Sequence, residues 1–253
     1  MRARMSGGVR GGGPTPPPTR FGWVSDRHPA WQAGITVAAL DPYRGDATAL
    51  RSVLGTAVRV LDAFHVVRLG FTAVDQIRYR IQRDQTGHRG RTGDPLYRIR
   101  RLLRRGADHH TERSWARLLA GLAAGDTLDE QLARTWIAAH DLRLIFRCPD
   151  QARASQALYR WLTYCADSNI PELIRLATTI DSWRTELLAY FTTGGISNGP
   201  TKAINLLIKK IKRVGHGFRN FDNYRLRLLL HCGVDCDTVR ATPIRGRLPR
   251  SVA

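Results

Sequence analysis

The sequence lacks any apolar run that approaches the roughly 18 residues a membrane-spanning helix needs. Its first 20 residues are basic but contain no apolar segment of the kind found in a secretory signal. Both absences predict a cytoplasmic protein without a membrane partner. With 43% hydrophobic residues in a chain of 253, the sequence is still apolar enough to exclude general disorder and to build a core.

Acidic residues and lysine are scarce. The 21 acidic side chains stand against 40 basic ones, which gives a net charge of +19, and only four of the basic residues are lysines. A GC-rich genome accounts for arginine in place of lysine, but it does not account for the excess of base over acid. A globular chain this basic usually binds a polyanion, and nucleic acid is the commonest one.

Cysteine is rare as well, with only Cys148, Cys165, Cys232 and Cys236. In a reducing cytoplasm these four side chains are expected to be free thiols. His231 lies next to Cys232 and near Cys236, but three such groups without a second pair of cysteines are a weak zinc pattern. Buried or incidental thiols are therefore the favoured interpretation.

Composition and periodicity divide the chain into five segments. We expect a disordered Gly/Pro/Arg-rich segment at 1–20, followed by partial strands of an α/β core at 21–65 and a helical region at 66–191. A C-terminal core helix with a basic-aromatic motif is expected at 192–234, and a tail at 235–253.

Two short apolar runs, Ala33–Asp41 and Thr56–His65, predict buried parallel strands. They enclose a helix-compatible segment at 46–54, so together they have the size of a βαβ unit. From Val66 on, apolar residues recur at spacings of three and four, which predicts helices and no convincing strand. The predicted helices lie at 66–84, 96–105, 111–123, 128–146, 151–166, 171–190 and, after a Gly-rich loop, from Pro200 on.

Each predicted strand carries a carboxylate at or near its end, Asp41 in the first and Asp62 in the second. Ligands and metals of open α/β sheets gather at the carboxyl edge of the strands. Two carboxylates at that edge suit Mg²⁺, which prefers oxygen ligands. An aspartate before a proline also suits the cap of a turn, so both interpretations of Asp41 remain open.

Basic side chains cluster in three regions, at 96–105, 209–213 and 214–230. The stretch 214–230 interleaves aromatic residues with arginines, which suits contacts to phosphates and to unpaired bases. A Gly-rich turn whose aromatic residues pack on the sheet is the somewhat favoured interpretation of the same pattern. The basic run 209–213 is either a phosphate-binding face or a solvated one. The candidate nucleic-acid-binding residues are Arg101, Arg104, Arg105, Lys209, Lys210, Lys212, Arg213 and Arg219.

Four stretches, in this order and spacing, resemble the C-terminal part of bacterial insertion-sequence transposases of the ISL-three group: ALDPYRGDATALRSVL, RVLDAFHVVRLGFTAVDQIR, GRTGDPLYRIRRLL and ISNGPTKAINLLIKKIKRVGHGFRNFDNYRLRLLLHCG. The resemblance covers roughly residues 23–234. It implies an α/β fold, namely an incomplete RNase H-like core with a mixed sheet, its N-terminal strands missing, interrupted by a large all-helical insertion. It further implies a catalytic DDE triad that binds Mg²⁺ and acts on the element's ends and on target DNA. The implied location is the nucleoid, and the implied oligomeric partner is intact transposase.

The resemblance also assigns residues. Asp41 matches the second catalytic aspartate and would be a metal ligand, while Asp62 and His65 lie near the site on the next strand. Lys202 stands in the place of the catalytic glutamate, and Asp46 stands near the site where the family usually has an aromatic residue. No strand that ends in aspartate is found upstream to supply the first member of the triad.

These departures predict a truncated transposase that is catalytically inactive as this chain. Two alternatives remain beside it: a DNA-binding regulator that competes with intact transposase at the element ends, and a pseudogene product that does not fold stably. An unrelated helical RNA-binding protein is the weakest interpretation.

Overall fold

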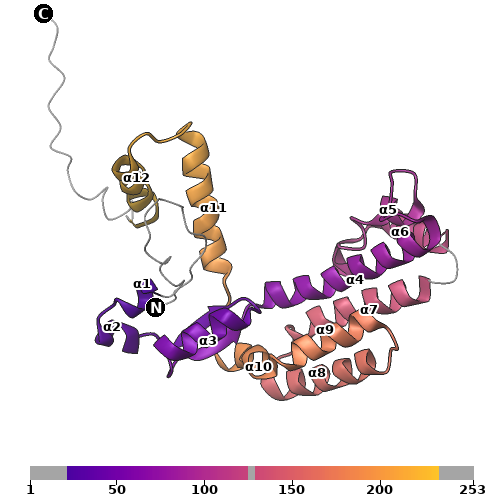
Figure 1. Ribbon diagram of the computed structural model, residues 1–253, viewed down its shortest axis with the longest axis horizontal. Coiled ribbons are helices and arrows are strands. Elements are labelled where there is room, and N and C mark those ends of the chain that lie inside the picture. The colour runs from indigo at the N-terminus through magenta and orange to yellow at the C-terminus, as the bar shows by residue number, and fades with distance from the viewer. Residues whose placement is uncertain (1–21, 125–128, 234–253) are drawn as a thin grey trace, which may run out of the picture. The chain divides into compact units, whose positions relative to one another are not determined.

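The computed structural model describes residues 22–124 and 129–233 (Figure 1). The described residues up to Asn198 form one compact unit, and those from Gly199 on form a second. The predictions for residues 1–20, for the tail at 235–253 and for Cys236 fall outside the described residues. The predicted domain boundaries stay a prediction.

Helices dominate both units, as the sequence predicts. The first unit contains α1 (Gly22–Ser25), α2 (Pro29–Ala33), β1 (Val37–Leu40), α3 (Arg44–Val53), β2 (Val58–Leu61), α4 (Ala63–Thr86), α5 (Pro95–Ile99), the 3-10 helix η1 (Ala107–His109), α6 (Glu112–Ala123), α7 (Asp129–Ile145), α8 (Gln151–Ala166), α9 (Pro171–Asp181) and α10 (Arg184–Thr192). The second contains α11 (Gly199–Val214) and α12 (Phe221–Gly233).

The sheet of the described residues consists of β1 and β2, which run parallel and are joined by α3. The register pairs Val37 with Val58 and Leu40 with Leu61. The two strands are rich in valine and leucine, and Val60 and Leu61 are completely buried, as expected for a parallel sheet. Helix α10 packs against β2. The α/β class is thus confirmed, and the further strands of an RNase H-like core stay a prediction.

The second strand is shorter than the sequence suggests. It ends at Leu61, and Asp62 occupies the N-cap position of α4, in an extended conformation. The backbone carbonyl of Asp62 accepts hydrogen bonds from the amides of His65 and Val66, at 2.9 and 3.2 Å. The prediction that His65 lies on a strand is therefore wrong, because its amide belongs to the first turn of a helix.

Helix α4 is the central element of the helical region and packs along α7 and α9 (Figure 1). Gly70 allows the close approach of α7, because a Cβ atom added there would lie 3.3 Å from the Cα atom of Ala139. Among the described residues from 66 to 191 there is no strand, which agrees with the sequence analysis. This long helix therefore connects the edge of the sheet directly to the helical layer.

Two predicted helices differ from the structure. The helix expected at 96–105 ends at Ile99 and is followed by a series of turns. These turns allow the next two apolar side chains, Leu102 and Leu103, to be buried together. The helix expected at 171–190 is broken into α9 and α10 at Ser182, where the following Trp183 is buried. In both cases the burial of a specific side chain, which periodicity does not encode, decides where the helix ends.

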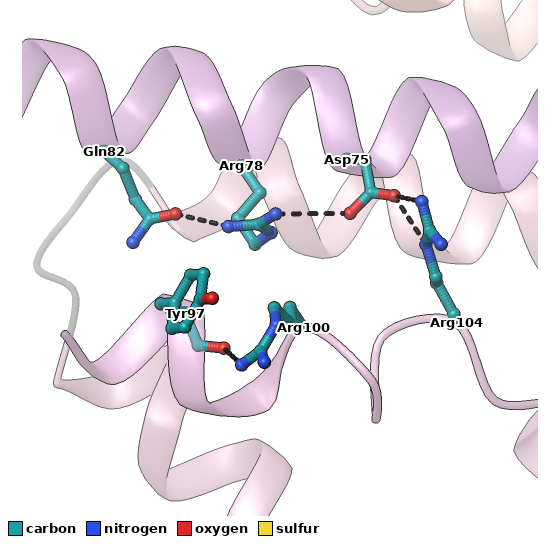
Figure 2. A network of polar contacts seen from close by, with 6 residues as sticks. All are labelled: Asp75, Arg78, Gln82, Tyr97, Arg100 and Arg104. Carbon is teal, nitrogen blue, oxygen red and sulfur yellow. Dashed lines mark hydrogen bonds and ion pairs between the residues drawn. The ribbon is translucent and has the colours of Figure 1, made fainter. Parts of the chain in front are cut away.

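A buried polar network joins α4 to the turns after α5 (Figure 2). The guanidinium of Arg78 donates to Gln82 Oε1 at 2.5 Å and lies 3.5 Å from Asp75 Oδ1. Arg104 Nε donates to the other carboxylate oxygen of Asp75, also at 2.5 Å. Because Arg78 is only 1% exposed, its charge requires the nearby carboxylate of Asp75. The network thereby fixes the turn that carries Arg104.

His140 on α7 is buried between the rings of Phe71 and Trp136, and its Nε2 atom has no hydrogen-bond partner. Burial lowers the pKa of His140 to about 4, with a further contribution from Arg143. Since an unfolded histidine has a pKa of about 6.5, the unfolded chain binds the proton more tightly. Stability is therefore lost as the pH falls from about 6.5 towards about 4, by up to roughly 3 kcal/mol from this group.

The contribution of His140 to stability is measured by urea unfolding of the chain at several pH values between about 4 and about 6.5. We expect His140→Phe to reduce the loss of stability on acidification, because the variant has no imidazole to protonate. The control is His109→Phe, since the side chain of His109 is 71% exposed. Equal pH dependence of all three proteins would contradict the prediction.

The second unit is a pair of helices. No residue of α11 is buried within this unit, and the apolar side chains of Ile204, Leu206 and Val214 are largely exposed. The ring of Phe218, in the turn between the helices, lies 4.9 Å from the ring of Tyr224 on α12. No helix in the described residues has the length and apolar character to cross a membrane.

Candidate metal centre

Asp41 and Asp62 follow directly after the two strands. Since Leu40 and Leu61 are paired in the parallel register, the residues after them emerge at the same edge of the sheet. His65 lies three residues after Asp62 on the first turn of α4, so both face the same side. The structure thus brings together the two carboxylates that the strand ends indicate and a histidine from the adjoining helix.

The three side chains converge closely. Nδ1 of His65 lies 2.5 Å from Oδ1 of Asp41 and 3.0 Å from Oδ2 of Asp62. One possible ligand atom from each side chain lies within 4.8 Å of the other two. The side chain of Asp62 is 1% exposed and that of Asp41 is 37% exposed. The cluster is therefore buried at Asp62 and open to solvent at Asp41.

Asn198 holds both carboxylates in place. Its backbone amide donates to Oδ1 of Asp62 at 3.2 Å, and its side-chain amide donates to Oδ1 of Asp41 at 3.3 Å. Asn198 is itself only 3% exposed. Sequence reasoning did not assign this residue, although the Gly-rich loop that precedes it and the NGP sequence that it begins were the available signal.

The donor set suits a divalent cation. Nδ1 of His65 is buried between two carboxylates and has no hydrogen-bond partner. Two carboxylates and an imidazole are ligands that Mn²⁺ and related metals accept, while Mg²⁺ would use the oxygens. The chemistry of the three side chains therefore fits the metal that the sequence analysis expects at Asp41.

The other predicted site residues lie elsewhere. Asp46 is in the first turn of α3 and is not part of the cluster. Lys202 is in the first turn of α11, four residues after Asn198. Arg104 is exposed and paired with Asp75. The remaining predicted nucleic-acid contacts are exposed too, namely Arg101, Arg105, Lys209, Lys210, Lys212, Arg213 and Arg219.

Comparison with known proteins gives three findings. A family model described as a transposase, of the ISL3-type DDE group, matches residues 19–228. Two curated relatives, each named as the transposase for insertion sequence element IS1557 and from Mycobacterium tuberculosis strains CDC 1551 / Oshkosh and H37Rv, are 29% identical over 184 residues. The alignments take in 65% of this chain but only 40% of each relative, so the chain spans less than half of their length. No solved structure matches.

Proposed function

Because this chain belongs to the ISL3-type family of DDE transposases, we propose that it binds insertion-sequence DNA and holds one divalent cation at Asp41, Asp62 and His65. The observation that carries the proposal is the convergence of these three side chains at the sheet edge, inside the region that the family model matches. The net charge of +19 supports DNA as the partner.

A cation bound there supplies Lewis-acid stabilisation of the charge on a phosphate. The protein's own residues hold the ligands of this cation in position. Asn198 orients both carboxylates through its two amide groups, and the buried position of Asp62 keeps water away from one side. The exposed side of Asp41 is where a DNA phosphate would approach.

We further propose that the chain does not cut DNA by itself. Two-metal chemistry needs ligands for a second ion, and the described residues bring only two carboxylates and one histidine together at this edge. Lys202, which stands in the place of the catalytic glutamate, offers an ammonium and no ligand oxygen. It is also in the first turn of a helix, where an acid is favoured over a base.

The lysine therefore favours the second candidate function, a DNA-binding regulator that competes with intact transposase for the element ends. Such a regulator needs affinity for DNA but no second metal ion. Its partners are the element's DNA and, as a mixed oligomer, the intact enzyme. Inhibition of strand transfer by the intact enzyme, at concentrations where this chain occupies the ends, supports this candidate.

The test of the inactive site is a nicking assay on supercoiled plasmid and on duplexes carrying the element's ends, with Mg²⁺ or Mn²⁺. The unmodified chain is expected to leave both DNAs intact. Lys202→Glu alone is also expected to be inactive, because a single added carboxylate does not complete two metal sites. Nicking by the unmodified chain that Asp41→Ala abolishes would show that its ligand set is already complete.

A further inference from the structure

A cavity of about 460 Å³ lies beside the first turns of α4. Its walls include side chains from α4, from the turns around Gly106 and from α7. The volume falls within the roughly 300–1,000 Å³ of small-molecule sites. The residues that determine its chemistry are Phe64, Arg68, Phe71, Arg104, His109 and Arg143.

The α4 side of the cavity carries two aromatic rings. Phe64 and Phe71 are seven residues apart, which places them on the same face of the helix two turns from each other. Phe64 is 58% exposed, although it follows the nearly buried Asp62 by only two residues. An exposed phenylalanine that lines a cavity offers a face on which a planar base can stack.

Three arginines supply the positive charge and the hydrogen-bond donors of the cavity. Arg68 lies one helical turn after Phe64, and Arg104 and Arg143 come from the other walls. Arg104 is held by Asp75 (Figure 2), and Arg143 donates to both carboxylate oxygens of Asp108 at 2.7 and 2.9 Å.

A guanidinium has five N–H donors, so an arginine that is fixed by a carboxylate keeps donors for a second acceptor. The described residues that line the cavity include no acidic side chain. Arg104 and Arg143, which are held by carboxylates, and Arg68 therefore give the cavity a cationic lining beside the aromatic rings, which suits a phosphate group.

We propose that this cavity takes one unpaired nucleotide of the bound DNA, with its base against Phe64 and Phe71 and its phosphate on the arginines. The inference rests on the proposed function and deepens it by naming what the first turns of the helical region recognise. Phe64 lies between Asp62 and His65 in the sequence, and its ring is 5.4 Å from that of His65. A nucleotide held here would therefore belong to the DNA at the metal centre.

The test compares two duplexes of equal length, one fully paired and one with a single unpaired 2-aminopurine. We expect the unmodified chain to bind the second duplex about tenfold more tightly and to quench its fluorescence, because each base–aromatic stack strengthens binding. Phe64→Ala is expected to bring the affinity ratio close to one, and Phe64→Trp to restore it. Tyr159→Ala, which removes a 66% exposed ring from α8, is the control and should keep the full ratio.

Each other result has a definite meaning. If the unmodified chain binds both duplexes equally, or if Phe64→Ala leaves the ratio unchanged, the proposal is wrong while DNA binding stands. If neither duplex is bound, the proposed function fails together with it. If free deoxyadenosine monophosphate fills the cavity as tightly as the unpaired duplex does, the site is for free nucleotides and the DNA role is overturned. Thermal melting of each variant establishes that it is folded.

Discussion

Binding of this chain to a duplex of about 30 base pairs is expected to weaken about 500-fold when the salt concentration rises fourfold, from about 50 to about 200 mM. Five of the exposed basic side chains of the second unit are predicted nucleic-acid contacts, namely Lys209, Lys210, Lys212, Arg213 and Arg219. If each neutralises one phosphate, the slope of log affinity against log salt is about −4.5, because every contact contributes about −0.9. Fluorescence anisotropy over a salt series measures it.

A double variant identifies the side chains responsible. Lys209→Ala with Lys210→Ala should make the slope less negative by about 1.8, since two phosphate contacts are lost. Arg153→Ala with Arg160→Ala removes the same charge from the exposed face of α8 and serves as the control. Affinity that does not change with salt, or equal effects of the two double variants, would contradict the assignment of these contacts.

Replacing Asp62 by asparagine is expected to weaken Mn²⁺ binding by at least tenfold. The substitution keeps the shape of the side chain and an oxygen that can accept from the Asn198 amide, but it removes the charge of a carboxylate that is 1% exposed and is proposed as a ligand. Asn198→Ala is expected to weaken binding by roughly 10-fold to 100-fold, because groups that orient metal ligands contribute on that scale. Isothermal titration of the purified chain with Mn²⁺ measures both.

The control for charge is Asp46→Asn, which removes one carboxylate from the first turn of α3, outside the cluster. It should leave the affinity for Mn²⁺ within about twofold. Failure of the unmodified chain to bind Mn²⁺, or an equal loss in Asp46→Asn and Asp62→Asn, would show that the cluster is not a metal site.

The place of Asp41 and Asp62 could be predicted from the sequence, whereas the place of His65 could not. Each aspartate follows an apolar run of strand-forming residues, and parallel strands bring their carboxyl ends to one edge. The run around Ala63 is also apolar, so its composition does not show that the strand has ended and a helix has begun. The N-cap geometry of Asp62 makes that distinction.

The contact of Asn198 was beyond sequence reasoning for a different reason. It joins residues that are 136 positions apart, and it depends on the path by which the chain returns to the sheet after α10. The two helices that were predicted with wrong ends, at 96–105 and 171–190, fail for a related reason. Periodicity reports which face of a helix is apolar, but the burial of Leu103 and Trp183 depends on neighbours from elsewhere in the fold.

The first turns of α4 make two contacts whose directions are fixed relative to each other by the geometry of the helix. His65 must face Asp62 at one end, and Gly70, five residues later, must face Ala139 of α7. Each residue of an α-helix turns the direction of the next side chain by about 100°, so one residue gained or lost between these positions would swing one contact away from its partner. Length variation between homologues should accordingly be absent from this stretch and accumulate instead after the left-handed Gly87 that ends the helix.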